Sequence, residues 1–110
     1  AQRLVTENEI DKALDFLRDS AAAIGEAKRR TRMAEHMVKH IEALMSKASE
    51  ERSAEARKAD ARTTDRWLEA IQEDAVAAGE YEKMRSLREA AALKIETWRT
   101  ESSNYRAMKL

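Results

Sequence analysis

The chain has 110 residues with no proline, no cysteine and two glycines, and its 21 basic residues balance 21 acidic ones. A chain without cysteine forms no disulfide or thiolate metal site, and a net charge of zero disfavours a dedicated nucleic-acid binder, which usually carries a basic excess. Charged residues make up 38% and aromatic residues 5% of the sequence, a composition typical of long helices with a narrow apolar stripe.

A first long helix is predicted over residues 7–48. Thr6 and Glu9 have the spacing of a capping box at its start. Small or apolar residues then recur at intervals of three and four, which is one face of a helix. This stripe consists of Ile10, Leu14, Leu17, Ala21, Ile24, Ala27, Thr31, Ala34, Val38, Ile41, Met45 and Ala48. The step from Ile24 to Ala27, beside Gly25, breaks the alternation, so we expect the stripe to shift phase there.

Serines, alanines and charges dominate residues 49–63. We predict that this segment is a partly helical connector with a turn near Ser49–Ser53. A second long helix is predicted over residues 64–106, capped by Thr63 or Thr64. Its stripe consists of Trp67 or Leu68, then Ile71, Ala75, Ala78, Tyr81, Met84, Arg88, Ala91, Ile95, Trp98, Ser102 and Tyr105. Together the segments predict a single helical domain over residues 1–110.

The two glycines, Gly25 and Gly79, divide each long helix into an acidic part followed by a basic part. The two halves of the chain also align at an offset of 54 residues, glycine on glycine, which indicates a weak internal repeat. Antiparallel pairing places each acidic part beside a basic part, whereas parallel pairing opposes like charges. The charge order therefore favours an antiparallel arrangement, although each surface pair contributes at most about 1 kcal/mol.

We therefore expect an all-α fold: a long antiparallel helical hairpin, resembling a coiled coil, that dimerises into a helical bundle. In this arrangement Gly25 and Gly79 lie almost opposite each other and mark a close approach or slight kink between the helices. The alternative is a compact four-helix bundle in which Gly25 and Gly79 form the turns between shorter helices.

Two long helices bury little surface by themselves, so a partner is expected. Methionines on a second stripe of the first helix, and aromatic residues on the second helix, are the side chains that protein interfaces favour. We predict a homodimer and a further, unidentified protein partner. The candidate interface residues are Met33, Met37, Leu44, Trp67, Trp98, Arg99 and Tyr105.

The basic segment 28–40 is the candidate for nucleic-acid contact, because lysine and arginine side chains bind phosphates. Its candidate residues are Lys28, Arg29, Arg30, Arg32 and Lys39. The competing interpretation is a solvated face that the acidic part of the other helix neutralises.

His36 and His40 are four residues apart, so both side chains lie on one face of the helix and could share a zinc ion. No third ligand is indicated, and solvated histidines on a basic face are the favoured interpretation, so we expect no metal. The sequence also lacks a phosphate-cradling glycine loop, a nucleophile motif and a marked acid–base pair. We therefore expect no enzymatic activity, no cofactor and no small-molecule substrate.

Three stretches carry a family resemblance: "RMAEHMVKHIEALM", "SAEARKADARTTDRWLEAI" and "EKMRSLREAAALKIETWRTESSNYRA". They resemble a family of small all-helical proteins of tailed bacteriophages and prophages, whose function is unknown. The matching features are an Ala-Glu pair in the first helix, a lysine- and alanine-rich connector, an aromatic-leucine helix start and a closing I-E-x-W-R-T block. In this chain they are Ala34–Glu35, residues 53–61, Trp67–Leu68 and residues 95–100.

The resemblance covers residues 31–106 and implies an accessory role in DNA replication or recombination in a bacterial host. Family members often carry a tyrosine-alanine pair and a proline in the connector, where this sequence has "ARTT" at 61–64. The family supplies no catalytic residues to transfer.

These observations predict a non-enzymatic, phage-type protein that acts by binding another protein. The alternatives are direct nucleic-acid binding through the basic segment, and a structural or assembly role in the virion. No apolar run approaches the roughly 18 residues that a membrane span needs, and the N-terminus lacks a secretory-signal pattern. We therefore expect a protein of the host cytoplasm that makes no membrane contact.

Overall fold

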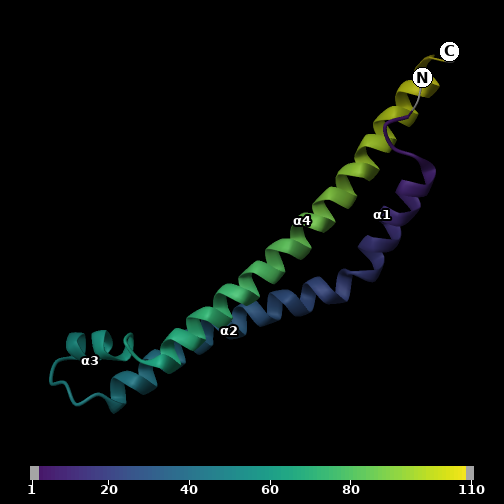
Figure 1. Ribbon diagram of the computed structural model, residues 1–110. Helices are drawn as coiled ribbons and strands as arrows, with labels where there is room; N and C mark the ends of the chain where they lie inside the picture. The colour runs from purple at the N-terminus through teal and green to yellow at the C-terminus, as the bar shows by residue number, and fades with distance from the viewer. Residues whose placement is uncertain (1–2, 109–110) are drawn as a thin grey trace. The chain divides into compact units, whose positions relative to one another are not determined.

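The computed structural model describes residues 3–108 and contains four α-helices (Figure 1). They are α1 (Glu7–Asp19), α2 (Ala21–Ala48), α3 (Ala54–Ala61) and α4 (Asp65–Met108). Within residues 3–108 there is no strand, so the prediction of an all-α fold is confirmed.

The chain forms two compact units. Unit 1 combines the N-terminal residues up to Gly25 with the C-terminal residues from Lys83 onward, and unit 2 is the intervening segment Glu26–Glu82. Unit 1 therefore pairs α1 with the second half of α4, and unit 2 contains most of α2, all of α3 and the first half of α4. Each unit brings together segments that are distant in the sequence.

Contacts between distant residues show that the helices in each unit run antiparallel. In unit 1 the Arg3 guanidinium donates to the Ser102 hydroxyl across 3.2 Å, whereas Arg88 reaches Ser20. In unit 2 the Lys28 ammonium lies 4.9 Å from the centre of the Tyr81 ring on α4, whereas Glu42, further along α2, lies 3.3 Å from Arg62, just before α4 begins. Low residue numbers thus pair with high ones, and the predicted antiparallel helical hairpin is confirmed in both units.

The start of α1 has the predicted capping box. The Thr6 hydroxyl accepts from the Glu9 N–H, and the Glu9 carboxylate accepts from the Thr6 N–H. Just before the cap, the Glu101 carboxylate on α4 accepts from the N–H groups of Leu4 and Val5 at 2.9 and 3.1 Å. These bonds satisfy backbone donors that the helix itself leaves without partners.

The predicted continuous helix over 7–48 is wrong at one position, because α1 ends at Asp19 and α2 begins at Ala21. In an uninterrupted helix the Leu17 carbonyl would accept from the Ala21 N–H. Here the Leu17 carbonyl accepts from Arg88 Nη1 at 2.7 Å instead. A side chain that inserts into the backbone hydrogen-bond ladder is a recognised cause of a helix break.

The side chains along α1 and α2 that lie inward follow an unbroken heptad pattern, which differs from the prediction at three positions. One of them is Ala48 at the end of the predicted stripe, which is exposed. Ala13 and Ser20 are buried, whereas Leu14 and Ala21 are exposed. With these two replacements the spacing alternates between three and four throughout, as in a coiled coil. The predicted phase shift beside Gly25 is therefore wrong. The inward positions are Ile10, Ala13, Leu17, Ser20, Ile24, Ala27, Thr31, Ala34, Val38, Ile41 and Met45.

The inward positions along α4 also follow a heptad pattern, which runs past Gly79 without interruption. Trp67 is half-buried and Leu68 is exposed, which decides between the two predicted starts. The prediction is wrong at Ala75 and Ala78, which are exposed. Their neighbours Asp74 and Ala77 occupy the inward positions. The inward positions are Trp67, Ala70, Asp74, Ala77, Tyr81, Met84, Arg88, Ala91, Ile95, Trp98 and Ser102.

The connector contains the short helix α3, as the partly helical segment was predicted to do. The Ser53 hydroxyl caps α3 by accepting from the Ala56 N–H at 3.0 Å. Ala61 at its end is fully buried. Thr64 then caps α4, since its hydroxyl accepts from the Trp67 N–H at 3.3 Å.

Both glycines lie inside helices, Gly25 in α2 and Gly79 in α4, with ordinary negative φ angles. The alternative fold with turns at the glycines is therefore wrong. The predicted close approach is also wrong, because a Cβ atom added at either glycine would meet no atom within 4 Å. Neither glycine is required by a turn or by packing within its unit.

Candidate functional site

Unit 2 has an open groove of about 580 Å³ between α2 and the first half of α4. We call it the unit 2 groove. Small side chains of the helix pair, including Ala34 and Ala77, form its floor. The complete lining is Ala27, Arg29, Arg30, Met33, Ala34, Met37, Glu69, Gln72, Glu73, Val76, Ala77 and Glu80.

Large aliphatic side chains in this groove are exposed. Met33 and Met37 are 52% and 40% accessible to solvent, and Val76 is 65% accessible. Leu44 lies two turns beyond Met37 on the same helix face and is 38% exposed. Since the inward positions carry mainly small residues such as alanine, the helix pair leaves these larger side chains outside its own core.

The two rims of the groove have opposite charge. The α4 rim carries Glu69, Glu73 and Glu80, and within the described part of the chain none of these carboxylates has an ion-pair partner. The α2 rim carries Arg29 and Arg30. A ligand that complements this groove therefore needs an apolar centre with basic groups on one side and acidic groups on the other.

The arginines of the α2 rim are held by a glutamate on the same helix. Glu26 Oε1 accepts from Arg29 Nη2 at 2.6 Å and lies 3.5 Å from Arg30 Nε. The hydrogen bond from Arg29 lowers the pKa of the Glu26 carboxyl below its ordinary value of 4.5, and the positive charges of both arginines act in the same direction. The same pairing raises the pKa of Arg29.

A second concave surface of unit 2 is basic. We call it the basic cleft; it lies between the end of α2 and the start of α3. Glu42 and Glu55 also line it, and Glu42 forms an ion pair with Arg62 at 3.3 Å. Arg57 donates to the Glu51 carbonyl at 2.7 Å. The basic residues lining this cleft are Lys39, Lys47, Arg52, Arg57 and Lys58.

The five predicted nucleic-acid residues separate in the structure. Lys28 lies over the Tyr81 ring, and Arg29 and Arg30 pair with Glu26 and line the unit 2 groove. Arg32 is exposed and lines neither concave surface. Lys39 lies in the basic cleft. The segment 28–40 therefore contributes to two different surfaces.

The seven predicted interface residues also separate. Met33 and Met37 line the unit 2 groove and Leu44 extends its exposed face. Trp67 and Trp98 are half-buried, and neither indole N–H has a hydrogen-bond acceptor among the described residues.

Unit 1 contains the last three of these seven residues, Trp98, Arg99 and Tyr105. Arg99 is exposed and pairs with Glu96 at 3.1 Å. Tyr105 is partly covered by the Arg3 guanidinium, which lies 5.2 Å from the Tyr105 ring centre and 5.8 Å from that of Trp98.

Val76 and the glutamates of the α4 rim were missed by the sequence reasoning. Val76 stands alone between alanines and charged residues, so it has no apolar neighbour at helical spacing outside the predicted stripe. The signal that could have found it is the heptad of α4 fixed at Asp74 and Ala77. That assignment places Val76 between Glu73 and Glu80 on the outer side of the helix.

His36 and His40 are exposed on α2. Among residues 3–108 no group of three or more histidine, aspartate or glutamate side chains is arranged to hold a metal ion. None of the helices described has the length and apolar character that would be needed to cross a membrane.

No known protein family, curated protein or solved structure matches the chain.

Proposed function

We propose that the chain is a non-enzymatic binding protein and that its unit 2 groove receives an α-helix of a protein partner. The observation that carries the proposal is the exposure of Met33, Met37 and Val76 in one groove between rims of opposite charge. Helix-in-groove recognition uses this combination of an apolar strip and flanking charges. Contiguous exposed apolar surface is a mark of interaction sites.

The exposure of most leucine side chains also supports a binding role. Only Leu17 is half-buried among the described leucines, whereas the others are exposed to 38% or more. The exposed ones are Leu4, Leu14, Leu44, Leu68, Leu87 and Leu93. These exposed leucine side chains are therefore accessible to a partner molecule.

The resemblance to small phage proteins suggests the process. On that resemblance, the chain acts as an accessory protein of DNA replication or recombination in the cytoplasm of a bacterial host. A protein-binding groove is compatible with such a role because accessory proteins act through contacts rather than chemistry.

Site-specific photocrosslinking tests the groove. A benzophenone amino acid is placed at position 76 in the chain expressed in bacterial cells, and the cells are irradiated. Because Val76 is exposed in the groove, we expect crosslinked adducts that are lost when Met33→Asp is introduced into the same chain.

Position 78 provides the matched control. Ala78 is exposed on the same helix two residues away but does not line the groove. Equal crosslinking from positions 76 and 78, or adducts that survive Met33→Asp, would contradict the proposed function.

A second candidate function, direct binding of nucleic-acid phosphates, is favoured by the basic cleft rather than by residues 28–32. Lys39, Lys47, Arg52 and Lys58 converge on it. No ion pair involves any of these four in the described part of the chain. Unpaired cations of this kind bind phosphates with an affinity that falls as salt rises.

Fluorescence anisotropy with a labelled single-stranded oligonucleotide tests this candidate. Binding at low salt should weaken in the variant Lys47→Glu/Lys58→Glu, and the slope of log affinity against log salt should fall by about 1 to 2. The control Arg106→Glu, far from the cleft in the sequence and outside unit 2, should leave binding unchanged. Absence of binding at low salt would exclude this function.

A further inference from the structure

We propose that the occupant of the unit 2 groove is the same groove of a second copy, related by a two-fold axis that runs parallel to α2 and α4. This inference rests on the proposed function, because it names the protein that the groove binds. In this dimer each copy's α2 rim lies on the α4 rim of the other copy, and four helices enclose the apolar strip.

The apolar contents of the groove are suited to such a contact. Met33, Met37 and Val76 are exposed in one copy, and a second copy supplies the same three side chains to cover them. Two-fold interfaces are self-complementary, because the same surface serves both partners. Methionine packs well in such a contact because its unbranched side chain adapts to irregular gaps.

The register of α2 against α4 fixes which residues would meet. The Lys28 ammonium lies 4.9 Å from the Tyr81 ring centre, and residues 27–37 of α2 line one groove with residues 69–80 of α4. Positions 28 and 81 are therefore within about one helical turn of the same level. Because the helices are antiparallel and rise equally per residue, Arg30 is level with the turn that contains Glu80. By the same count Met33 is level with Val76.

The direction of the two-fold axis decides the charge pattern. A two-fold axis parallel to the helices leaves the height of each residue along the helices unchanged. It places α2 of one copy opposite α4 of the other copy. Arg30 of one copy then meets Glu80 of the other, and Met33 meets Val76. Opposite charges and apolar groups are thus matched twice in each dimer, which gives the interface its specificity.

The other face-to-face arrangement has its axis perpendicular to the helices and places α4 on α4. The glutamates of the α4 rim then face those of the other copy, and no basic residue of α4 lines the groove to neutralise them. Like charges brought together in this way disfavour an arrangement. Charge complementarity therefore selects the parallel axis.

Charge reversal at Arg30 and Glu80 tests both the partner and the axis by analytical ultracentrifugation. Wild-type chains should form a species with twice the mass of one chain. Arg30→Glu alone or Glu80→Arg alone creates two like-charge contacts per dimer, so each should weaken dimerisation by at least about tenfold at low salt. In about 1 M salt, where charges are screened beyond roughly 3 Å, both should approach wild type.

The decisive measurement mixes the two variants. An equimolar mixture of Arg30→Glu and Glu80→Arg chains restores opposite charge at both contacts, so it should dimerise within about threefold of wild type. Arg32→Glu, a reversal on α2 outside the groove, should leave dimerisation unchanged. Circular dichroism confirms that each exposed substitution preserves the helices.

Each outcome has a defined meaning. A mixture that dimerises no better than its components would overturn the proposed axis. A wild-type chain that stays monomeric at every concentration would overturn the second copy as occupant. In that case crosslinks from position 76 to a different protein would still support the proposed function, whereas no crosslinks from position 76 would remove both proposals.

Discussion

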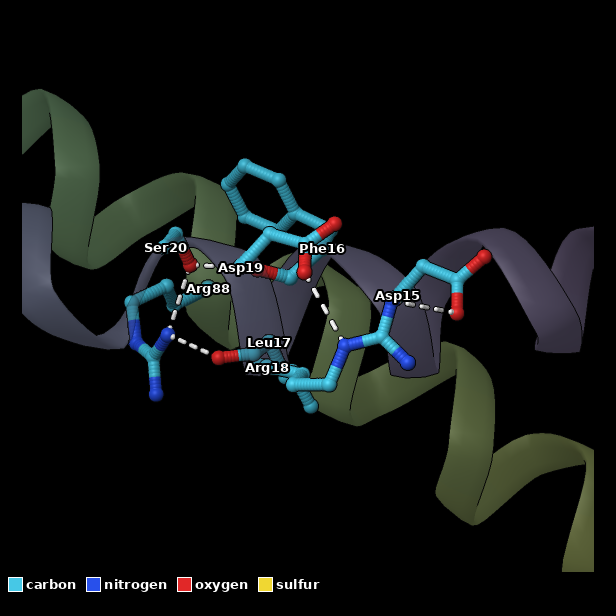
Figure 2. Close-up of polar contacts among 7 residues, drawn as sticks. All are labelled: Asp15, Phe16, Leu17, Arg18, Asp19, Ser20 and Arg88. Carbon is cyan, nitrogen blue, oxygen red and sulfur yellow. Dashed lines mark hydrogen bonds and ion pairs between the residues drawn. The ribbon is translucent and has the colours of Figure 1, made fainter.

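Arg88 Nη1 lies 2.6 Å from the Ser20 hydroxyl oxygen and joins the inward face of α4 to the residue between α1 and α2 (Figure 2). The same nitrogen donates to the Leu17 carbonyl at 2.7 Å. Ser20 in turn donates its hydroxyl hydrogen to the Phe16 carbonyl at 2.5 Å. One guanidinium therefore serves both as a helix cap and as the link between the two helices of unit 1.

Removing this link should destabilise unit 1. Arg88→Ala leaves the Leu17 carbonyl and the Ser20 hydroxyl without their donor, so we expect a loss of about 1 to 3 kcal/mol in the free energy of unfolding. Ser20→Ala should cost about 1 kcal/mol. Because the two groups share one hydrogen bond, the double variant should lose less than the sum, with a coupling of about 1 kcal/mol.

Urea denaturation of the four proteins in this double-mutant cycle measures the coupling. Arg99→Ala is the control, since Arg99 is exposed and, among residues 3–108, forms an ion pair only with Glu96 on its own helix. Its effect should stay within about 0.5 kcal/mol. Fully additive losses at positions 20 and 88 would show that the hydrogen bond contributes nothing to stability.

The hydrogen bonds of Arg88 also help to explain why the sequence pattern predicted the wrong inward residues in and just after α1. Periodicity, charge order and the capping-box spacing predicted the antiparallel helices, the cap at Thr6 and the inward positions of α2 from Ile24 to Met45. Leu14 is more hydrophobic than Ala13, so a search for apolar residues selects it. The structure places Leu14 outside, because the heptad continues through Ser20, where Arg88 needs a hydroxyl partner.

The helix break and the groove could be predicted less well for related reasons. A break is expected at glycine, but Gly25 lies inside α2. The break at Ser20 depends on a donor that comes from residue 88, and local sequence contains no sign of it. The groove depends on the register of α2 against α4, which turns scattered residues such as Met33 and Val76 into one surface.

The contact of Glu101 with the N-terminal segment gives a second prediction. Its carboxylate accepts from the Leu4 and Val5 N–H groups, and hydrogen bonds to charged groups contribute about 1.5 to 3 kcal/mol. Glu101→Ala should therefore release residues 3–6 and lower the stability of unit 1 by about 1 to 2 kcal/mol.

Amide hydrogen exchange at Leu4 and Val5 measures this release directly. Both amides should exchange faster in Glu101→Ala. Glu96→Ala provides a matched control, because Glu96 lies on the same helix and its one ion pair within the described part of the chain is with Arg99. Unchanged protection of both amides in Glu101→Ala would contradict the prediction.

Glu26 gives a third prediction, which concerns pH. Its pKa is lowered in the folded state, chiefly by the hydrogen bond from Arg29, so folding favours the carboxylate. This contribution to stability is complete above the ordinary value of 4.5 and is lost as the pH falls through the lower folded value. A carbon-13 titration of the Glu26 carboxyl should therefore have its midpoint below 4.5.

The variant Arg29→Ala should move this midpoint upward toward 4.5 but not fully to it, since Arg30 remains nearby. Arg32→Ala is the control, because Arg32 makes no contact with Glu26 among the described interactions. A midpoint that does not move in Arg29→Ala would assign the lowered pKa to another cause.

The glycines give the last prediction. Gly25 and Gly79 lie inside helices with negative φ angles, and a Cβ atom at either would meet nothing within 4 Å. Alanine has the higher helix propensity and reduces the entropy of the unfolded chain. Gly25→Ala and Gly79→Ala should therefore each stabilise the protein by about 0.5 to 1 kcal/mol, measured by urea denaturation.

Ala78→Gly is the matched control, since Ala78 is exposed on α4 beside Gly79. It should destabilise the protein by about 0.5 to 1 kcal/mol, the reverse of Gly79→Ala. A loss of stability in Gly25→Ala or Gly79→Ala would mean that another molecule packs against the glycine so closely that a Cβ atom does not fit there. Gly79 is next to Glu80 on the α4 rim, so a loss confined to Gly79→Ala at dimer-forming concentrations would indicate close helix contact between two copies.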